Sequence, residues 1–341
     1  MDQRLAAAFD AALACGHLVF TPSTVVAVHA GRIAFQVRFA PSLAKKPTKP
    51  VPQPQPSADA TRNHSFNNPF LSPEPELLVD ASLLPLHNIL LNKFSIVKGH
   101  ALITTKHWES QSEPLSPSDM AAAFIFLHAT SPATPHLAFF NCGPLSGASV
   151  PHKHLQFIPV PAQEGGIPIQ PLLDAHAPSV PHWLPTRVPG LPFLHRAAFF
   201  PSGVASDDPR LHTAYMRLVV DAFSAVGVDF HATLNADPAA LRALHADSID
   251  ATLCPKKEMS YNVIFTRTWM VLVPRRAEAG SVSGVSVNSV GFAGMVLVKS
   301  EEQLNAFKST GQDGGSRLAE LLAEVAYPSD SSLTNSAEGH L

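Results

Sequence analysis

Alternating apolar and polar residues predict many of the strands in this chain. The longest alternation runs through residues 20–39, where Gly31 interrupts it and predicts the turn of a β-hairpin. Other short apolar runs are also typical of strands. A second hairpin is expected from residues 94–97 and 101–105, a third from residues 262–266 and 270–274, and a further strand pair within residues 286–300. The chain is therefore expected to contain antiparallel sheet built from local hairpins.

Apolar residues spaced three and four apart predict the helices. Ser116, Pro117 and Asp119 precede one such run and are residue types that start helices. The helices are expected within residues 3–16, 117–130, 212–228, 238–253 and 301–310. Proline and glutamine are frequent in residues 47–63, and proline is frequent in residues 161–210. We therefore expect an extended loop in the first segment and irregular coil in the second.

The composition is that of a globular protein and limits the possible functions. Of 341 residues, 45% are hydrophobic and 15% are charged, and the net charge of −3 comes without a basic block for nucleic acid. No apolar run approaches the roughly 20 residues of a membrane span, and Asp2 and Asp10 argue against a secretory signal. The widely spaced Cys15, Cys142 and Cys254 predict a reducing compartment. We expect a cytoplasmic protein, with an organelle or the nucleus left open.

The clearest candidate chemistry lies in one stretch, NCGPLSGASVPHKHLQFIPV, at residues 141–160. Small and turn-forming residues come first and leave backbone N–H groups free to face an anion. From His152 onwards the alternation suits a strand, on which His152, His154 and Gln156 would share one face. A neutral imidazole there could attack a phosphoryl group and hold it as a phosphoramidate. The glutamine amide could donate a hydrogen bond to a phosphate oxygen.

Two other interpretations fit this spacing. The histidines could be ordinary hydrogen-bonded residues of a strand. Alternatively, two histidines that lie two apart on a strand could chelate zinc. The spacing by itself does not choose among the three, because neutral histidine can serve in each role.

The string SGASVPHKHLQ resembles the histidine-triad superfamily, in the branch whose third histidine is replaced by glutamine. That branch includes galactose-1-phosphate uridylyltransferases and the diadenosine tetraphosphate phosphorylases, which are also ATP adenylyltransferases. Other strings resemble the phosphorylases, so that the likeness spans residues 20–299. These strings are NPFLSPEPELLV, HNILLNKFSIVKGHALITTKHWESQ, SYNVIFTRTWMVLVPR and NSVGFAGMVLVK. The chain also lacks the Cys-x-x-Cys pair expected of a zinc-containing uridylyltransferase.

The resemblance implies an α+β fold of histidine-triad-like antiparallel sheets with flanking helices, arranged as two related halves. Residues 1–165 would form the catalytic half and residues 166–341 an ATP adenylyltransferase-like half, with a disordered tail after about residue 327. The second half has no His-x-His-x-Gln motif, so it would bind the other end of the ligand.

The resemblance also implies roles for individual residues. His154 would attack the α-phosphorus, the backbone carbonyl of His152 would accept its Nδ1 proton, and Gln156 would bind the phosphoryl oxygens. The other expected substrate contacts are Lys46, Asn92, Lys93, Asn141, Gly147, Ala148, Ser149, Val150, Asn288, Ser289, Val290, Met295 and Lys299. Among them, the lysines would balance the charge of a polyphosphate. The alternative for the lysines is a solvated edge, and for residues 288–299 an ordinary glycine-rich turn.

The implied reaction is the phosphorolysis of diadenosine 5',5'''-P1,P4-tetraphosphate to ATP and ADP through an adenylyl-histidine. The expected partners are these small molecules and phosphate, and the protein is expected to be a monomer. No metal site and no required cofactor are expected, although a divalent cation such as Mg²⁺ could assist through the polyphosphate. Hexose-1-phosphate uridylyl transfer and a non-enzymatic nucleotide sensor stay as alternatives, with a sulfate-dependent reaction as a side activity.

Overall fold

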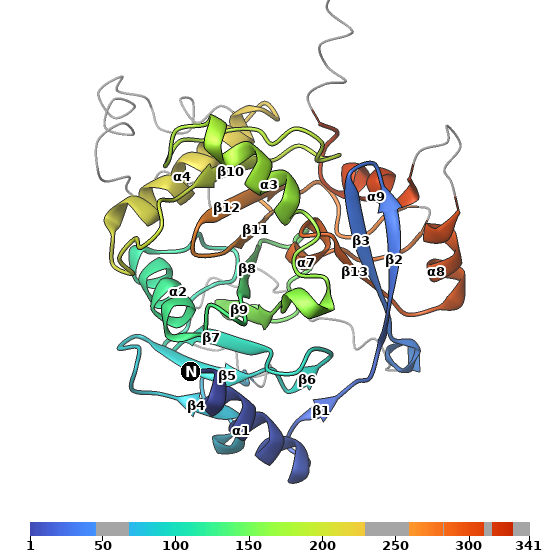
Figure 1. Ribbon diagram of the computed structural model, residues 1–341. Helices are drawn as coiled ribbons and strands as arrows, with labels where there is room; N and C mark the ends of the chain where they lie inside the picture. The colour runs from blue at the N-terminus through green and yellow to red at the C-terminus, as the bar shows by residue number, and fades with distance from the viewer. Residues whose placement is uncertain (46–67, 229–258, 282, 310–315, 330–341) are drawn as a thin grey trace, which may run out of the picture.

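The computed structural model describes residues 1–45, 68–228, 259–281, 283–309 and 316–329. Its centre is an eight-stranded sheet in which every neighbouring pair is antiparallel. From one edge to the other, the strands are β10 (Arg196–Phe199), β12 (Trp269–Pro274), β11 (Tyr261–Phe265), β8 (His136–Cys142), β9 (His154–Pro159), β7 (Ala101–Thr105), β5 (His87–Leu91) and β4 (Leu78–Asp80). The boundary predicted after residue 165 thus falls within a continuous sheet (Figure 1). The division into two halves stays a prediction.

Two smaller sheets accompany the large one. A three-stranded sheet has the order β13 (Met295–Val298), β3 (Ile33–Phe39) and β2 (Thr24–Ala30). In it β3 pairs with β2 in antiparallel fashion and with β13 in parallel, although these partners lie far apart in the chain. A two-stranded parallel sheet joins β1 (Val19–Phe20) to β6 (Phe94–Ser95). The N-terminal hairpin is therefore attached to the C-terminal part of the chain.

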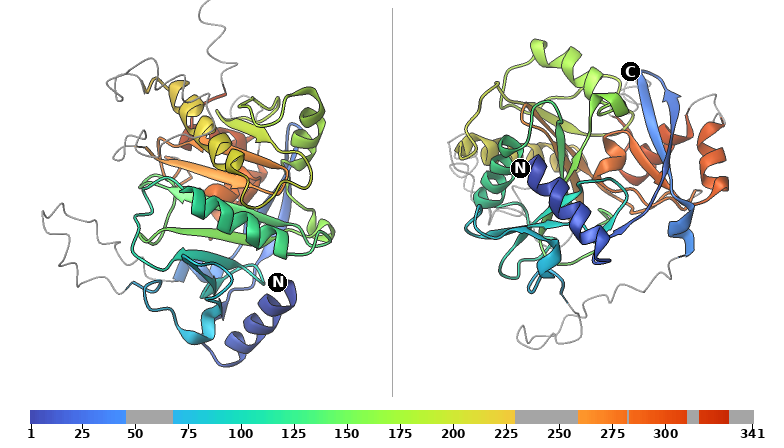
Figure 2. Two further views of the ribbon diagram at one scale, coloured as in Figure 1. Left: turned by 90° about the vertical axis from the view of Figure 1, so that its left-hand side faces the viewer. Right: turned by 60° about the horizontal axis from the view of Figure 1, so that its bottom comes forward.

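The helices and the three-stranded sheet cover the two faces of the large sheet. The described helices are α1 (Asp2–Ala14), α2 (Pro117–Ala129), α3 (Gln170–His176), α4 (Pro209–Ser224), α7 (Ser289–Phe292), α8 (Glu301–Lys308) and α9 (Arg317–Val325). On one face, α2 and α4 lie side by side (Figure 2) and build a core around Phe124 and Phe140. On the other, β3, α3, α7 and α9 build a core around Phe139 and Phe292. Consecutive residues of β8 enter different cores because strand side chains alternate between faces.

Several predictions of secondary structure are confirmed. Helices occur at α1, α2, α4 and α8, and hairpins occur at β2–β3 and β11–β12. Helix α2 begins where expected because Ser116 and Asp119 form a capping box. The α+β fold class is confirmed as well.

The predicted hairpin of residues 94–97 and 101–105 is wrong. Strand β6 pairs with β1, whereas β7 lies between β5 and β9. Sequence reasoning missed β5 because all five of its residues are buried, so that it has no alternation of apolar and polar residues.

Residues 286–300 and 161–210 also differ from expectation. The first segment forms the short helix α7 and the single strand β13, not a strand pair, because the Asn288 side chain caps α7 and Gly294, with φ 95°, turns the chain afterwards. The second contains α3 and β10 within its coil. The helix expected at residues 238–253, the loop at residues 47–63 and the tail from residue 330 lie outside the described residues.

Within the ranges that the structure describes, none of the helices has both the length and the apolar character needed to cross a membrane.

Candidate active site

Strand β9 places His154 and Gln156 on one face of the large sheet. Its register with β7 sets Thr104 opposite His154 and Leu102 opposite Gln156. The buried side chain of Gln111 holds the start of the strand, because its Oε1 accepts from the His154 backbone N–H at 2.8 Å and its Nε2 donates to the Asn141 carbonyl at 2.8 Å. The two side chains that were predicted to act together are therefore fixed to a rigid central strand.

His154 is buried and held in one tautomer. Its Nδ1 lies 2.8 Å from the backbone carbonyl oxygen of His152, which is the contact that the resemblance implies. A carbonyl can only accept, so Nδ1 carries the proton and Nε2 keeps its lone pair. Burial lowers the pKa of His154 to about 4, and the imidazole is neutral near pH 7. The ring is therefore in the form that a nucleophile needs.

The ring of His152 is occupied at both nitrogens. Its Nε2 lies 2.9 Å from the Thr105 carbonyl oxygen and so carries the proton, while Nδ1 accepts from Nδ2 of Asn68 at 2.9 Å. This leaves neither nitrogen for zinc. Among the described residues no group of three or more His, Cys, Asp or Glu side chains is placed to hold a metal ion.

Lys153 lies between the two histidines in sequence but points to the opposite face of the sheet. Its ammonium is 2.5 Å from Glu109 and 3.5 Å from Asp119, and Asp119 is also 2.7 Å from His87. Burial alone would lower the pKa of Lys153, but the carboxylates of Asp119 and Glu109 outweigh it and raise that pKa. The buried ammonium thus anchors the backbone between the two imidazoles.

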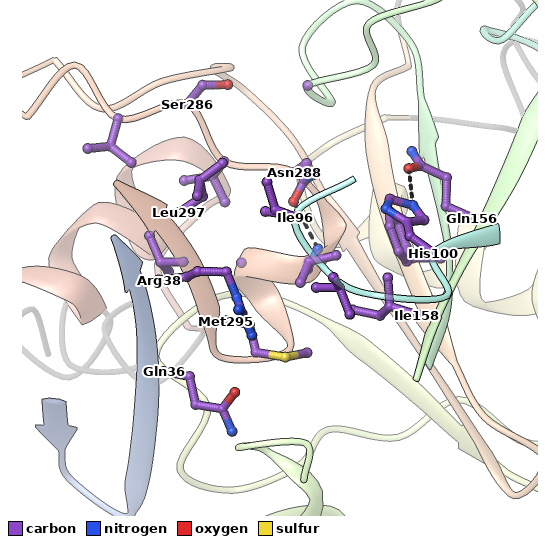
Figure 3. A pocket seen from close by; sticks show the side chains of 18 of the residues that line it. Gln36, Arg38, Ile96, His100, Gln156, Ile158, Ser286, Asn288, Met295 and Leu297 are labelled. Carbon is purple, nitrogen blue, oxygen red and sulfur yellow. Dashed lines mark hydrogen bonds between the residues drawn. The ribbon is translucent and has the colours of Figure 1, made fainter. Parts of the chain in front are cut away.

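A cavity of about 300 Å³ opens beside Gln156, between β9 and the sheet of β3 and β13 (Figure 3). The predicted contacts that line it are Gly147, Gln156, Asn288, Val290, Met295 and Lys299. Gly147 has φ 78°, and a Cβ there would lie 3.0 Å from the Val287 carbonyl oxygen. Glycine at this position lets the histidine loop lie against the segment that leads into α7. The structure thus brings parts of both predicted halves to one cavity.

His152, His154 and several predicted contacts lie outside the lining of this cavity. Asn141 and Ser289 bind each other, because Oδ1 of Asn141 accepts from the backbone N–H, 2.9 Å, and the hydroxyl, 2.6 Å, of Ser289. Asn262 donates to the same oxygen at 2.8 Å. These buried bonds connect β8, β11 and α7, so they hold the two sides of the cavity together.

The remaining predicted contacts are placed as follows. Lys93 pairs with Glu74 at 2.5 Å in a half-exposed ion pair, and Asn92 contacts His100. Ala148, Ser149 and Val150 belong to the histidine loop but do not line the cavity, and Val150 packs against the small core around Phe70. Lys46 lies outside the described residues.

Sequence reasoning missed three residues that surround the two histidines and the glutamine. The ring centroids of Phe70 and His154 lie 5.1 Å apart, and those of Trp108 and His152 lie 5.4 Å apart. Nε2 of His100 donates to Oε1 of Gln156. Trp108 is 52% exposed, but this exposure is a property of the fold, so it was not a signal in the sequence. No sequence signal was available for Phe70 and His100, because the site residues that they contact, His154 and Gln156, lie more than 50 positions away.

A buried neutral imidazole, an amide two residues along the same strand and a cavity formed by both parts of the chain are suited to group transfer at phosphorus. On this α+β fold they define a nucleotidyltransferase.

Comparison with known proteins identifies the family. The family model described as Ap4A phosphorylase N-terminal domain matches residues 1–175, and that described as ATP adenylyltransferase C-terminal domain matches residues 189–328. Diadenosine 5',5'''-P1,P4-tetraphosphate phosphorylase 2 of Saccharomyces cerevisiae is 31% identical over 316 residues, which are 89% of each chain. This chain belongs to the Ap4A phosphorylase family.

Solved structures agree with this assignment. The crystal structure of yeast Ap4A phosphorylase Apa2 is similar with a TM-score of 0.72 and 27% sequence identity, over 96% of this chain and 97% of that chain. A crystal structure of Apa2 in complex with Ap4A gives a TM-score of 0.70 at the same identity and coverage. The likeness therefore extends over both parts of the chain.

Proposed function

We propose that this chain catalyses the phosphorolysis of diadenosine tetraphosphate (Ap4A) to ATP and ADP, with His154 as the transient carrier of the adenylyl group. The observation that carries the mechanism is the neutral His154 ring, whose Nδ1 is bonded to the His152 carbonyl and whose Nε2 keeps its lone pair. The similarity to yeast Ap4A phosphorylases supports the choice of substrate.

The reaction would proceed in two displacements. Nε2 of His154 attacks the α-phosphorus of one adenylyl group, the bond to the bridging oxygen breaks, and ATP leaves. Phosphate then attacks the same phosphorus, the P–N bond breaks, and ADP leaves. Both steps conserve atoms, and the free imidazole is restored at the end.

The neutral glutamine favours transfer over hydrolysis. The Gln156 amide and the backbone amides of residues 147–150 would bind the non-bridging oxygens, where charge is concentrated in the transition state. An amide neither protonates a leaving group nor activates water, so the intermediate would last until phosphate arrives. Lys46, Lys93 and Lys299 would offset the charge of the polyphosphate, and Mg²⁺ bound to the phosphates could assist. The cytoplasmic location and the monomeric state stay predictions of this proposal.

Intact-mass measurement tests the proposal directly. Incubation with Ap4A should add one adenylyl unit to the protein and release ATP, and addition of phosphate should remove the unit and release ADP. A parallel incubation with UDP-glucose and galactose-1-phosphate tests uridylyl transfer, and sulfate in place of phosphate tests the side reaction. A nucleotide sensor would bind Ap4A without any gain in mass, and that result would refute the covalent mechanism.

The rate of adenylyl-enzyme formation should stay constant in mildly acidic solution. Only neutral His154 can attack, and its pKa of about 4 keeps it neutral at a pH where a histidine with the ordinary value of 6.5 is mostly protonated. We expect a level single-turnover rate between about pH 7 and about pH 5, followed by a decline towards pH 4. Rapid quench measures the rate, and circular dichroism at each pH checks that the protein stays folded. A loss of half the rate near pH 6.5 would show that burial does not set the pKa of the nucleophile.

A further inference from the structure

His100 is a buried histidine that lines the cavity, next to the strand that pairs with β9. It directly precedes β7, and its Nε2 lies 3.0 Å from Oε1 of Gln156, which is on β9. Both residues line the cavity, and Figure 3 shows the amide oxygen of Gln156 turned towards the His100 ring. The two displacements described above assign no role to His100.

The contact matters because the two ends of a glutamine amide have opposite chemistry. The oxygen would repel a phosphoryl oxygen, whereas the NH₂ group would bind it. Something must therefore decide which end faces the ligand. A ring N–H can hold only the oxygen end, so a donating Nε2 of His100 leaves the NH₂ group of Gln156 for the cavity.

The surroundings of His100 suit this role. Burial lowers the pKa of His100 to about 4, so the ring is neutral and carries a single N–H. Nδ2 of Asn92 lies 3.3 Å from Nδ1 of the His100 ring and 3.5 Å from its Nε2. Oδ1 of Asn92 accepts from the Phe94 backbone N–H at 2.9 Å, which fixes the orientation of that amide. The ring is thus confined by a side chain that the backbone itself holds.

We infer that His100 is a positioning residue that sets the orientation of the Gln156 amide, with its Nε2–H bound to Oε1 so that the NH₂ group points to the phosphoryl group. The inference rests on the proposed function, since it assigns Gln156 a role in binding the transferred group. It also gives Asn92 a role other than the nucleotide contact that the sequence predicts, namely support of the His100 ring.

A matched set of substitutions separates this role from simple packing. His100→Met keeps an apolar side chain of similar reach but has no donor, whereas His100→Gln places an NH₂ group near the position of Nε2. We expect His100→Met to lower the rate of adenylyl-enzyme formation about 10- to 100-fold, the size of one hydrogen bond to a charged oxygen. His100→Gln should recover most of that rate. His29→Met, on an exposed position of β2, serves as the control and should match the wild type.

A double-mutant cycle supplies the readout that a structural role would not produce. If His100 acts through Gln156, then His100→Met should have little further effect in a Gln156→Leu background. The loss in the single variant should appear in the transfer rate and much less in the binding of Ap4A, because the oxygens gain charge in the transition state. Thermal unfolding of each variant checks the fold.

The outcomes are distinct from those for the proposed function. An unmodified wild-type protein would refute the proposed function and this inference with it. A wild type that forms the adenylyl-enzyme, together with a His100→Met variant within twofold of its rate, would overturn the inference alone. Losses from His100→Met and Gln156→Leu that multiply in the double variant would also overturn it, because they would show that the residues act independently.

Discussion

Replacing His154 with asparagine should abolish formation of the adenylyl-enzyme and lower phosphorolysis by about 10³-fold or more, as expected for loss of a covalent nucleophile. Asparagine has an NH₂ group near the position of Nδ1, so it can keep the hydrogen bond to the His152 carbonyl that the wild type makes at 2.8 Å. It has no counterpart of Nε2. The substitution therefore removes the attacking atom while it retains the local support of the strand.

The measurement is the gain in mass after incubation with Ap4A, together with the release of ATP. His29→Asn offers a matched control, because it makes the same chemical change on the exposed side of β2. A His154→Asn protein that still gains an adenylyl unit would assign the nucleophile to another residue. A variant that binds Ap4A without reaction would separate affinity from chemistry at this site.

Replacing Asp119 with asparagine should cost about 3 to 5 kcal/mol of the free energy of unfolding, as the removal of one partner from a buried ion pair does. The Asp119 side chain is 1% exposed and lies 2.7 Å from His87 and 3.5 Å from Lys153. The variant would leave the Lys153 ammonium buried with the half-exposed Glu109 as its remaining carboxylate partner among the described residues. The start of β9, and with it His154, would lose part of its anchor.

Urea denaturation measures the loss. Asp10→Asn is the control, because Asp10 and Lys98 form an ion pair that is about 60% exposed and should contribute less than about 1 kcal/mol. The difference in the free energy of unfolding between wild type and Asp119→Asn should also depend on pH. Burial would raise the pKa of Asp119, but its interactions with His87 and Lys153 lower that pKa below the ordinary value of 3.8. The contribution of Asp119 to the free energy of unfolding is therefore present above pH 3.8 and is lost as the pH falls further. A loss no larger than that of the control would contradict the anchoring role.

The fold could be predicted from sequence wherever one face of an element is exposed. The hairpin of β2 and β3 alternates because its outer side chains meet solvent, and α2 has a capping box at its start. Strands β5 and β7 are buried on both faces and give no period, and no short turn joins them as one joins the equally buried β11 and β12, so their pairing could not be seen. Helix α7 has four residues, too few for a helical period to appear.

The candidate site, like the fold, could be predicted from sequence only in part. His154 and Gln156 lie two apart, so local alternation was enough to place them on one face. The contact of Asn141 with Ser289 spans 148 positions, and that of His100 with Gln156 spans 56. Such contacts depend on which strands pair and in what register, and local patterns along the chain do not reveal this. The resemblance named Asn92, Asn141 and Ser289 as site residues, but neither His100 nor the bond between Asn141 and Ser289.

The pairing of β8 with both β9 and β11 has a consequence for dissection of the molecule. Expressing the two matched segments as separate proteins would deprive β8 of its backbone hydrogen bonds to β11 and expose an apolar strand edge that could pair with a second copy. Neither fragment would be a self-sufficient module. The two walls of the cavity therefore belong to a single cooperative unit.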